Sequence, residues 1–296
     1  MGLMLQYLRK VSAEFSGGLT LNPGGIARHE IKIEFQITKG ISSKSNTARI
    51  SIWNLTESHR NSMGKEFDKI TLKAGYIPPG DSGNVGVIFK GDVRDVEHQR
   101  DGADIVTIIS CGDGQKALLR SNISKTFPMG TPTKDVIEEI YKQMEKEGID
   151  RGEWKFPESM PKETKRPYSM CGSCRRELDT LGRSNKFYWS LQNETLEIVP
   201  GDSYIGGVVL LTPETGMIGT PAITDNGVRV SALLNPEIRP NRRIQIKSQT
   251  LEMNAADGMY RVSEVTYSGD NRDGDFQVDI TAEAIKGGKV DQGVNG

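Results

Sequence analysis

The chain has 296 residues, of which 35% are hydrophobic and 33 are glycine. That length allows two or three compact domains, and the modest apolar share predicts small cores. The 38 basic and 39 acidic residues leave a net charge of −1, which disfavours a dedicated nucleic-acid binder because binding many phosphates normally requires a basic excess.

The sequence carries no signal for export or membrane insertion. No apolar run is long enough for a membrane-spanning helix, and the first ten residues lack the regions of a signal peptide. Three cysteines, an odd number, fit a reducing compartment better than a disulfide scaffold. We therefore expect a protein that is made and kept in a cytoplasm.

Alternating apolar residues predict strands throughout the first third of the chain. Residues from Ile31 to Ile37 have the period of a half-buried strand, and the run from Ile105 to Cys111 is apolar on both faces, which suits a central strand. Thr56 can cap a short helix that ends near Met63. The alternation recurs at Ala48, Ile50 and Ile52, at Ile70, Leu72 and Ala74, and at Val85, Val87 and Phe89. Because few intervals could hold a crossover helix, we expect a mostly antiparallel sheet.

The middle third predicts a small α+β unit. Thr131 and Pro132 have the character of an N-cap and a first helical residue, and Gly148 can end that helix in the left-handed conformation. A second helix is predicted from Ser173 to Gly182. A hairpin then follows around the turn Gln192-Asn193-Glu194.

The last third returns to strands. Four are predicted, over Val228–Ala232, Ile244–Ile246, Met259–Tyr267 and Asp275–Ala284. Pro236 and Pro240 cannot donate to a ladder, so the segment between Asn235 and Asn241 is expected to be a turn or an edge. The polar, glycine-rich tail from Lys286 to Gly296 is expected to be mobile when the protein is alone.

This layout predicts a first β domain over residues 1–122, an inserted α+β domain over residues 123–204 and a second β domain over residues 205–296. No repeat is evident at the level of individual residues.

The sharpest chemical pattern is Cys171-Gly172-Ser173-Cys174, at the start of a predicted helix. A helix N-terminus can lower a thiol pKa, but the redox motif requires a βαβ context, and zinc would require two further ligands. We favour structural cysteines. The three histidines show no metal-binding spacing, and neither a nucleophile elbow nor a phosphate-binding loop occurs. We therefore predict no catalytic, cofactor-binding or metal-binding residues.

Two other patterns have ordinary interpretations. The pairs Arg175-Arg176 and Arg242-Arg243 could contact phosphates, but such pairs more often belong to a solvated face or an interface rim. The three tryptophans are too dispersed for a base-stacking platform and are expected to anchor three separate small cores: Trp53, Trp154 and Trp189.

Four segments carry a family resemblance through their order along the chain. They are NTARISIWNLT at 46–56, FKGDV at 89–93 with IVTIISCGDG at 105–114, ELDTL at 177–181 with YWSLQ at 188–192, and GTP at 219–221 with NGVRV and LNPEIRP between 226 and 240. The ordered set resembles the baseplate hub proteins of contractile-tailed bacteriophages, a family related to the base of the type VI secretion spike.

The resemblance implies a fold that is mainly β, with two tail-tube-like antiparallel β-barrel domains flanking a helix-helix-hairpin domain. It also implies a homotrimer whose six similar barrels adapt the six-fold tail tube to the three-fold central spike. Tail-tube or tube-initiator proteins would bind one side and the spike the other, and the genome and tape-measure protein would pass through the lumen. The protein would belong to the virion baseplate, assembled in the host bacterial cytoplasm.

Two groups of residues are predicted to contact partners. One is the loop from Ile77 to Asn84 with Pro78 and Pro79, and the other is the pair Arg242 and Arg243. The alternatives are a thiol-dependent or cell-wall-degrading enzyme centred on Cys171 and Cys174, and a generic β-rich attachment module. The sequence leaves open a phage, a bacteriocin or a secretion apparatus, and it does not identify the lumen-facing residues.

Overall fold

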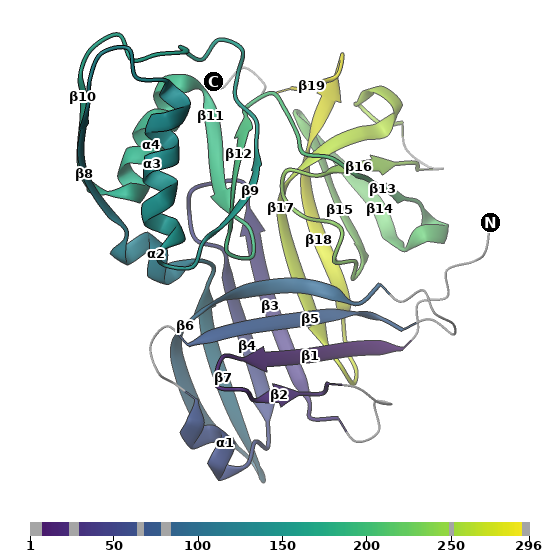
Figure 1. The fold of residues 1–296 in the computed structure, drawn as a ribbon. Helices are drawn as coiled ribbons and strands as arrows, with labels where there is room; N and C mark the ends of the chain where they lie inside the picture. Colours follow the sequence, from purple (N-terminus) through teal and green to yellow (C-terminus); the bar gives the residue numbers. More distant parts are fainter. Residues whose placement is uncertain (1–7, 24–29, 64–67, 78–83, 249–251, 292–296) are drawn as a thin grey trace.

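The computed structural model describes residues 8–23, 30–63, 68–77, 84–248 and 252–291. Strands dominate these residues, and most of them join one sheet (Figure 1). The predicted fold class, mainly β with a smaller α+β part, is therefore confirmed.

Three units follow one another along the chain. The first β unit contains β1 (Arg9–Phe15), β2 (Thr20–Leu21), β3 (Ile33–Gly40), β4 (Thr47–Trp53), α1 (Glu57–Ser62), β5 (Lys69–Tyr76), β6 (Gly86–Asp101) and β7 (Asp104–Gly112). The helical unit contains α2 (Gln115–Arg120), β8 (Asn122–Phe127), α3 (Thr133–Glu145), β9 (Asp150–Trp154), β10 (Tyr168–Ser173), α4 (Cys174–Asn185), β11 (Phe187–Leu191) and β12 (Thr195–Pro200). The second β unit contains β13 (Val208–Leu211), β14 (Met217–Thr224), β15 (Gly227–Leu233), β16 (Arg243–Ile246), β17 (Met259–Asp270), β18 (Phe276–Lys286) and β19 (Lys289–Val290).

The two β units have the same strand order. Neighbouring strands run β3-β4-β7-β6-β5-β1 in the first unit and β14-β15-β18-β17-β16-β13 in the second. Taken in chain order, β3 to β7 thus correspond one by one to β14 to β18. The outermost strand differs, because β1 is antiparallel to β5 whereas β13 is parallel to β16.

The correspondence extends to irregular details. One residue bulges from the first strand of each long hairpin, Arg94 between β6 and β7 and Ser263 between β17 and β18. Just before each bulge, the N–H of Val93 donates to a carbonyl in the first unit at 2.7 Å, and the N–H of Val262 donates to the corresponding carbonyl in the second at 2.8 Å. Such shared irregularities indicate that the two units are copies of one pattern.

The aligned strands also share sequence. Strand β4 contains most of the segment NTARIS at 46–51 and pairs with β7. Its counterpart β15 contains most of the segment NGVRVS at 226–231 and pairs with β18. Asn46, Arg49 and Ser51 recur as Asn226, Arg229 and Ser231. A short repeat therefore exists that is not evident from the sequence alone. The repeat is short and its copies lie far apart, so only the strand pairing reveals their alignment.

Strand β17 belongs to both β units. Its residues 259–261 pair with β16, and its residues 264–270 pair with β3 of the first unit. In that junction Tyr267 lies opposite Ile37, and one hydrophobic core extends through both units, from Val11 to Ala284. The domain division at residues 122 and 204 stays a prediction.

The helical unit has a core of its own. Helices α3 and α4 lie between the β8–β10 pair and the sheet of β9, β12 and β11 (Figure 1). Trp189 is buried in this core and Trp154 packs against it. Trp53 instead lies beneath the Lys32 ammonium, 4.5 Å from its ring centre. The prediction that the three tryptophans anchor three separate cores is therefore wrong.

Several local expectations can be compared with the elements. Thr56 caps α1, accepting the N–H of His59 at 3.3 Å, as predicted. Helix α3 begins one residue later than predicted, with Pro132 at the N-cap, and α4 continues beyond Gly182 to Asn185. The predicted alternation at Val85, Val87 and Phe89 is wrong, because a register shift in the β5–β6 ladder buries both Ile88 and Phe89. Part of the tail expected to be mobile forms β19, and residues 292–296 lie outside the described residues.

Candidate assembly interface

The tip of the β11–β12 hairpin is inserted against the first β unit. Asn193 and Glu194 form its two-residue turn and have φ angles of 57° and 61°. Such a turn requires positive φ at both positions, for which Asn is well suited and Glu is not. The presence of Glu194 therefore needs a compensating interaction, and its side chain supplies one.

Asp113, in the loop after β7, holds the turn. Its carboxylate accepts the backbone N–H groups of Asn193 and Glu194, each at 2.7 Å, and the amide of Asn46 at 3.1 Å. The Asp113 side chain is fully buried. Backbone donors aimed at a buried carboxylate satisfy its charge, so this contact fixes both the turn and the position of the hairpin.

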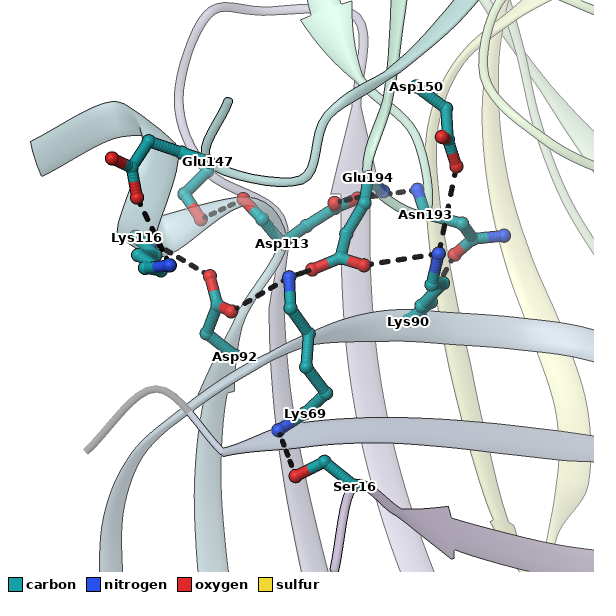
Figure 2. A network of polar contacts seen from close by, with 11 residues as sticks. Ser16, Lys69, Lys90, Asp92, Asp113, Lys116, Glu147, Asp150, Asn193 and Glu194 are labelled. Carbon is teal, nitrogen blue, oxygen red and sulfur yellow. Dashed lines mark hydrogen bonds and ion pairs between the residues drawn. The ribbon is translucent and has the colours of Figure 1, made fainter. Parts of the chain in front are cut away.

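Lysines from β5 and β6 complete the network (Figure 2). The Glu194 carboxylate is 1% exposed and pairs with Lys69 and, at 3.2 Å, with Lys90. Lys69 also lies 3.2 Å from the buried carboxylate of Asp92. The first β unit thus provides the cations that compensate the burial of Glu194.

Burial shifts two pKa values in this network. It lowers the pKa of Lys39, whose ammonium donates to the Asn193 side chain, to about 8. Burial also raises the pKa of the Asp113 carboxyl, although Lys39 and the surrounding hydrogen bonds act in the opposite direction. Both shifts reflect the cost of placing charge in a buried junction.

The helical unit is fixed to the second β unit as well. Glu197 on β12 pairs with Arg242 at 2.8 Å and accepts the Asn241 amide at 3.1 Å. Arg261 on β17 is 1% exposed, pairs with Glu283 and donates to the Gly201 carbonyl at 2.8 Å. The helical unit therefore bridges both β units through buried charged groups.

The residues predicted to face partners lie in two separate places. Arg242 is used in the Glu197 pair, and Arg243 stacks over Tyr204 with its guanidinium carbon 4.5 Å from the ring centre. Ile77 is exposed, and its N–H donates to the Leu8 carbonyl at 2.7 Å. Pro78 and Pro79 lie outside the described residues. These contacts do not test the predicted partner contacts, which stay predictions.

Exposed apolar side chains near Ile77 form a small patch. Leu8, Ile77 and Val85 are 47%, 36% and 36% exposed and lie at the end of the β1–β5–β6 ladder. The sequence pattern indicates Ile77 but neither Leu8 nor Val85, because only the strand pairing brings the three residues together.

The two cysteines of the CxxC pattern have different surroundings. Cys171 is exposed on β10, whereas Cys174 is buried at the start of α4. Burial, reinforced by the Glu177 carboxylate, raises the pKa of Cys174 to about 11. A reactive thiol requires a lowered pKa, so this environment is that of a core cysteine.

Among the described residues, no cluster of three or more His, Cys, Asp or Glu side chains could hold a metal ion. A cavity of about 780 Å³ lies beside α4 and β11. The Asp179 carboxylate at its wall accepts the Trp189 indole N–H at 2.9 Å, so this carboxylate has a structural role within the protein. Within the ranges the structure describes, no helix is both long and apolar enough to cross a membrane.

Comparison with known proteins gives a family and a fold. The family described as baseplate hub gp41 matches residues 10–282, and no curated protein matches the chain. The 43 kDa tail protein of prophage MuSo2 from Shewanella oneidensis superposes with a TM-score of 0.63 at 11% identity, over 95% of this chain and 98% of its own. A tail protein from Neisseria meningitidis MC58 gives 0.60 at 10% identity, over 94% and 97%.

A third similar structure is the E. coli c3393 protein, a component of the type VI secretion system. Its TM-score is 0.61 at 11% identity, over 94% of this chain and 78% of its own. At such identities the structures establish the fold, whereas the family match establishes membership. Because that match spans both β units and the helical unit, the predicted resemblance is confirmed: the chain belongs to the baseplate hub gp41 family.

Proposed function

We propose that this protein is the structural hub of a contractile-tail baseplate, in which three copies close into a ring. The duplicated strand order carries the proposal. Each chain presents two similar β units joined through β3 and β17, so three chains present six similar units in a circle. Such a ring has three-fold symmetry for a central spike and approximate six-fold symmetry for a tail tube.

The two sides of the ring bind different partners in this proposal. Tail-tube or tube-initiator proteins occupy one side and the spike protein occupies the other. The patch of Leu8, Ile77 and Val85, with the adjoining segment 77–84, is our candidate for a contact between layers. Deleting residues 78–83 should weaken stacking on the tube while leaving the fold intact. Normal particle assembly by the deletion variant would refute this assignment.

One polar face of the continuous sheet is our candidate for the wall of the channel. Cross-strand partners share a face, and the registers place Arg49, Gln36 and Ser268 on one face with Glu264, Thr281 and Arg229. Both signs of charge occur on this face. A mixed, polar wall suits passage of the genome and tape-measure protein, because it avoids the strong phosphate binding of a basic channel.

We also propose that the hub has no catalytic activity and belongs to the virion after assembly in the host cytoplasm. The raised pKa of Cys174 weighs against the thiol-enzyme alternative.

Negative-stain imaging and native mass spectrometry of the purified chain test the ring. Rings with a central hole and the mass of three chains would support the proposal. Monomers alone at concentrations well above micromolar, both with and without a spike protein, would refute it.

A further inference from the structure

We infer that the ring closes by sheet addition: β14 of one copy pairs antiparallel with the outer edge of β6, at residues 95–101, of the next copy. This inference rests on the proposed ring and specifies the strands and the register of its interface. It starts from the junction that the chain already contains.

The template is the pairing of β3 with β17. There β3, the edge strand of the first β unit, pairs with residues 264–270 of β17, the first strand of the β17–β18 hairpin in the second unit. The central residue pairs are Thr38 with Thr266, Ile37 with Tyr267 and Gln36 with Ser268.

Within the described ranges, the corresponding edges at the other ends of the two units are unpaired. Strand β14, the counterpart of β3, pairs only with β15 among the described strands. Strand β6, the counterpart of β17, pairs with β5 only as far as Asp92. From Asp95 to Asp101 its only partner in the described part of the chain is β7.

The shared bulges define which residues correspond. Aligning Arg94 with Ser263 places His98 on the position of Tyr267. Ile223 takes the position of Ile37, because Ile37 lies opposite Ala48 and Ile223 lies opposite Val228, the counterpart of Ala48. The register between copies is therefore Glu97 with Thr224, His98 with Ile223, and Gln99 with Ala222.

The central pair of the template, Ile37 with Tyr267, is buried, whereas the counterparts of these residues at the two free edges are exposed, as expected if a neighbouring strand is missing there. Ile37 and Tyr267 are both 0% exposed inside the chain. Their counterparts are open, because Ile223 is 38% exposed and His98 is also exposed. Covering β6 with β14 would bury Ile223 as β17 buries Ile37.

The contact is head-to-tail, because the two edges differ. A heterologous contact whose rotation closes forms a ring, and in that ring every β14 edge and every outer β6 edge is covered. Closure also removes the hazard of an uncovered edge strand, which otherwise invites uncontrolled pairing. The partner for which both edges are fitted is therefore a second copy of this chain.

Disulfide cross-linking tests the register. The variant carries His98→Cys and Ile223→Cys in a Cys171→Ser background and is oxidised in the assembled state. We expect a covalent species of three chains on non-reducing gels and nothing larger. The control carries His98→Cys and Ala222→Cys, which place the thiols on opposite faces. It should cross-link at least about tenfold less, because a disulfide requires Cβ atoms about 4 Å apart.

Each outcome decides a separate point. Covalent trimers from the first variant alone support both the strands and the register. Efficient cross-linking by the control instead overturns the register. Rings without cross-links in either variant overturn the strand pairing and leave the hub proposal standing. Circular dichroism and imaging of both variants verify folding and assembly, and the absence of any oligomer in the unsubstituted chain overturns the proposed function itself.

Discussion

The Asp113 carboxylate accepts the backbone N–H of Glu194 at 2.7 Å, although the two residues lie 81 positions apart. Through this bond a loop of the first β unit holds the turn of a hairpin in the helical unit. The same junction buries Asp113 and Glu194, with Lys39 beside them. Its charged groups make the relative position of the two units sensitive to single substitutions.

Asp113→Asn should destabilise the protein by about 2–4 kcal/mol, because one of the two turn N–H groups would face an amide donor in a buried site. Urea unfolding at a fixed protein concentration measures the loss, since assembly also adds stability. Glu237→Gln, at an exposed position, is the control and should stay within about 0.5 kcal/mol of the unsubstituted protein. A loss below about 1 kcal/mol in Asp113→Asn would contradict the assigned role.

Glu194→Ala and Glu194→Gly separate the backbone from the side chain. Both variants lose the ion pairs with Lys69 and Lys90, so both should be less stable than the parent. Glycine tolerates the φ of 61° at this position. The free energy of unfolding of the glycine variant should therefore be about 1 kcal/mol higher than that of the alanine variant. Thermal melting of the pair gives the difference. Equal stability of the two variants would show that the turn does not hold this conformation.

The lowered pKa of Lys39 predicts a dependence on alkaline pH. Between the folded pKa of about 8 and the unfolded value of 10.5, the unfolded state binds the proton that the folded state has lost. Stability arising from this group therefore rises with pH in that window, by at most about 1.4 kcal/mol per unit.

Lys39→Met removes this titration. Unfolding free energies should be measured for both proteins at several pH values. From pH 8 toward pH 10, the stability of the unsubstituted protein should increase relative to that of Lys39→Met. Comparing the two proteins cancels the contributions of the tyrosines. A difference that is constant with pH would contradict the burial of a charged Lys39.

A thiol reagent should distinguish the three cysteines. Cys171 is exposed, whereas burial raises the pKa of Cys111 to about 12 and that of Cys174 to about 11. We expect rapid reaction of Cys171 alone in the folded protein and of all three thiols in denaturant. Cys171→Ser should abolish the rapid phase. Rapid modification of Cys174 would instead revive the thiol-enzyme alternative.

The sequence predicted what local chemistry determines. Thr56 caps its helix, and the turn at Asn193 joins two strands, because side-chain caps and turn residues act over a few positions. The role of Asp113 was missed, since in the sequence it stands in a Gly-Asp-Gly turn and its partners lie some eighty residues away. The repeat was missed for a similar reason. Its two copies, around Arg49 and Arg229, share few identical residues, and the helical unit lies between them in the sequence.

The sharing of β17 between the two β units has a consequence for synthesis. Thr38 and Thr266 lie opposite each other, 228 residues apart. A chain emerging from the ribosome completes β3 long before its partner exists, so an open strand edge persists while the rest is translated. Pairing over such a separation also slows folding. We therefore expect fragments that end before β17 to aggregate.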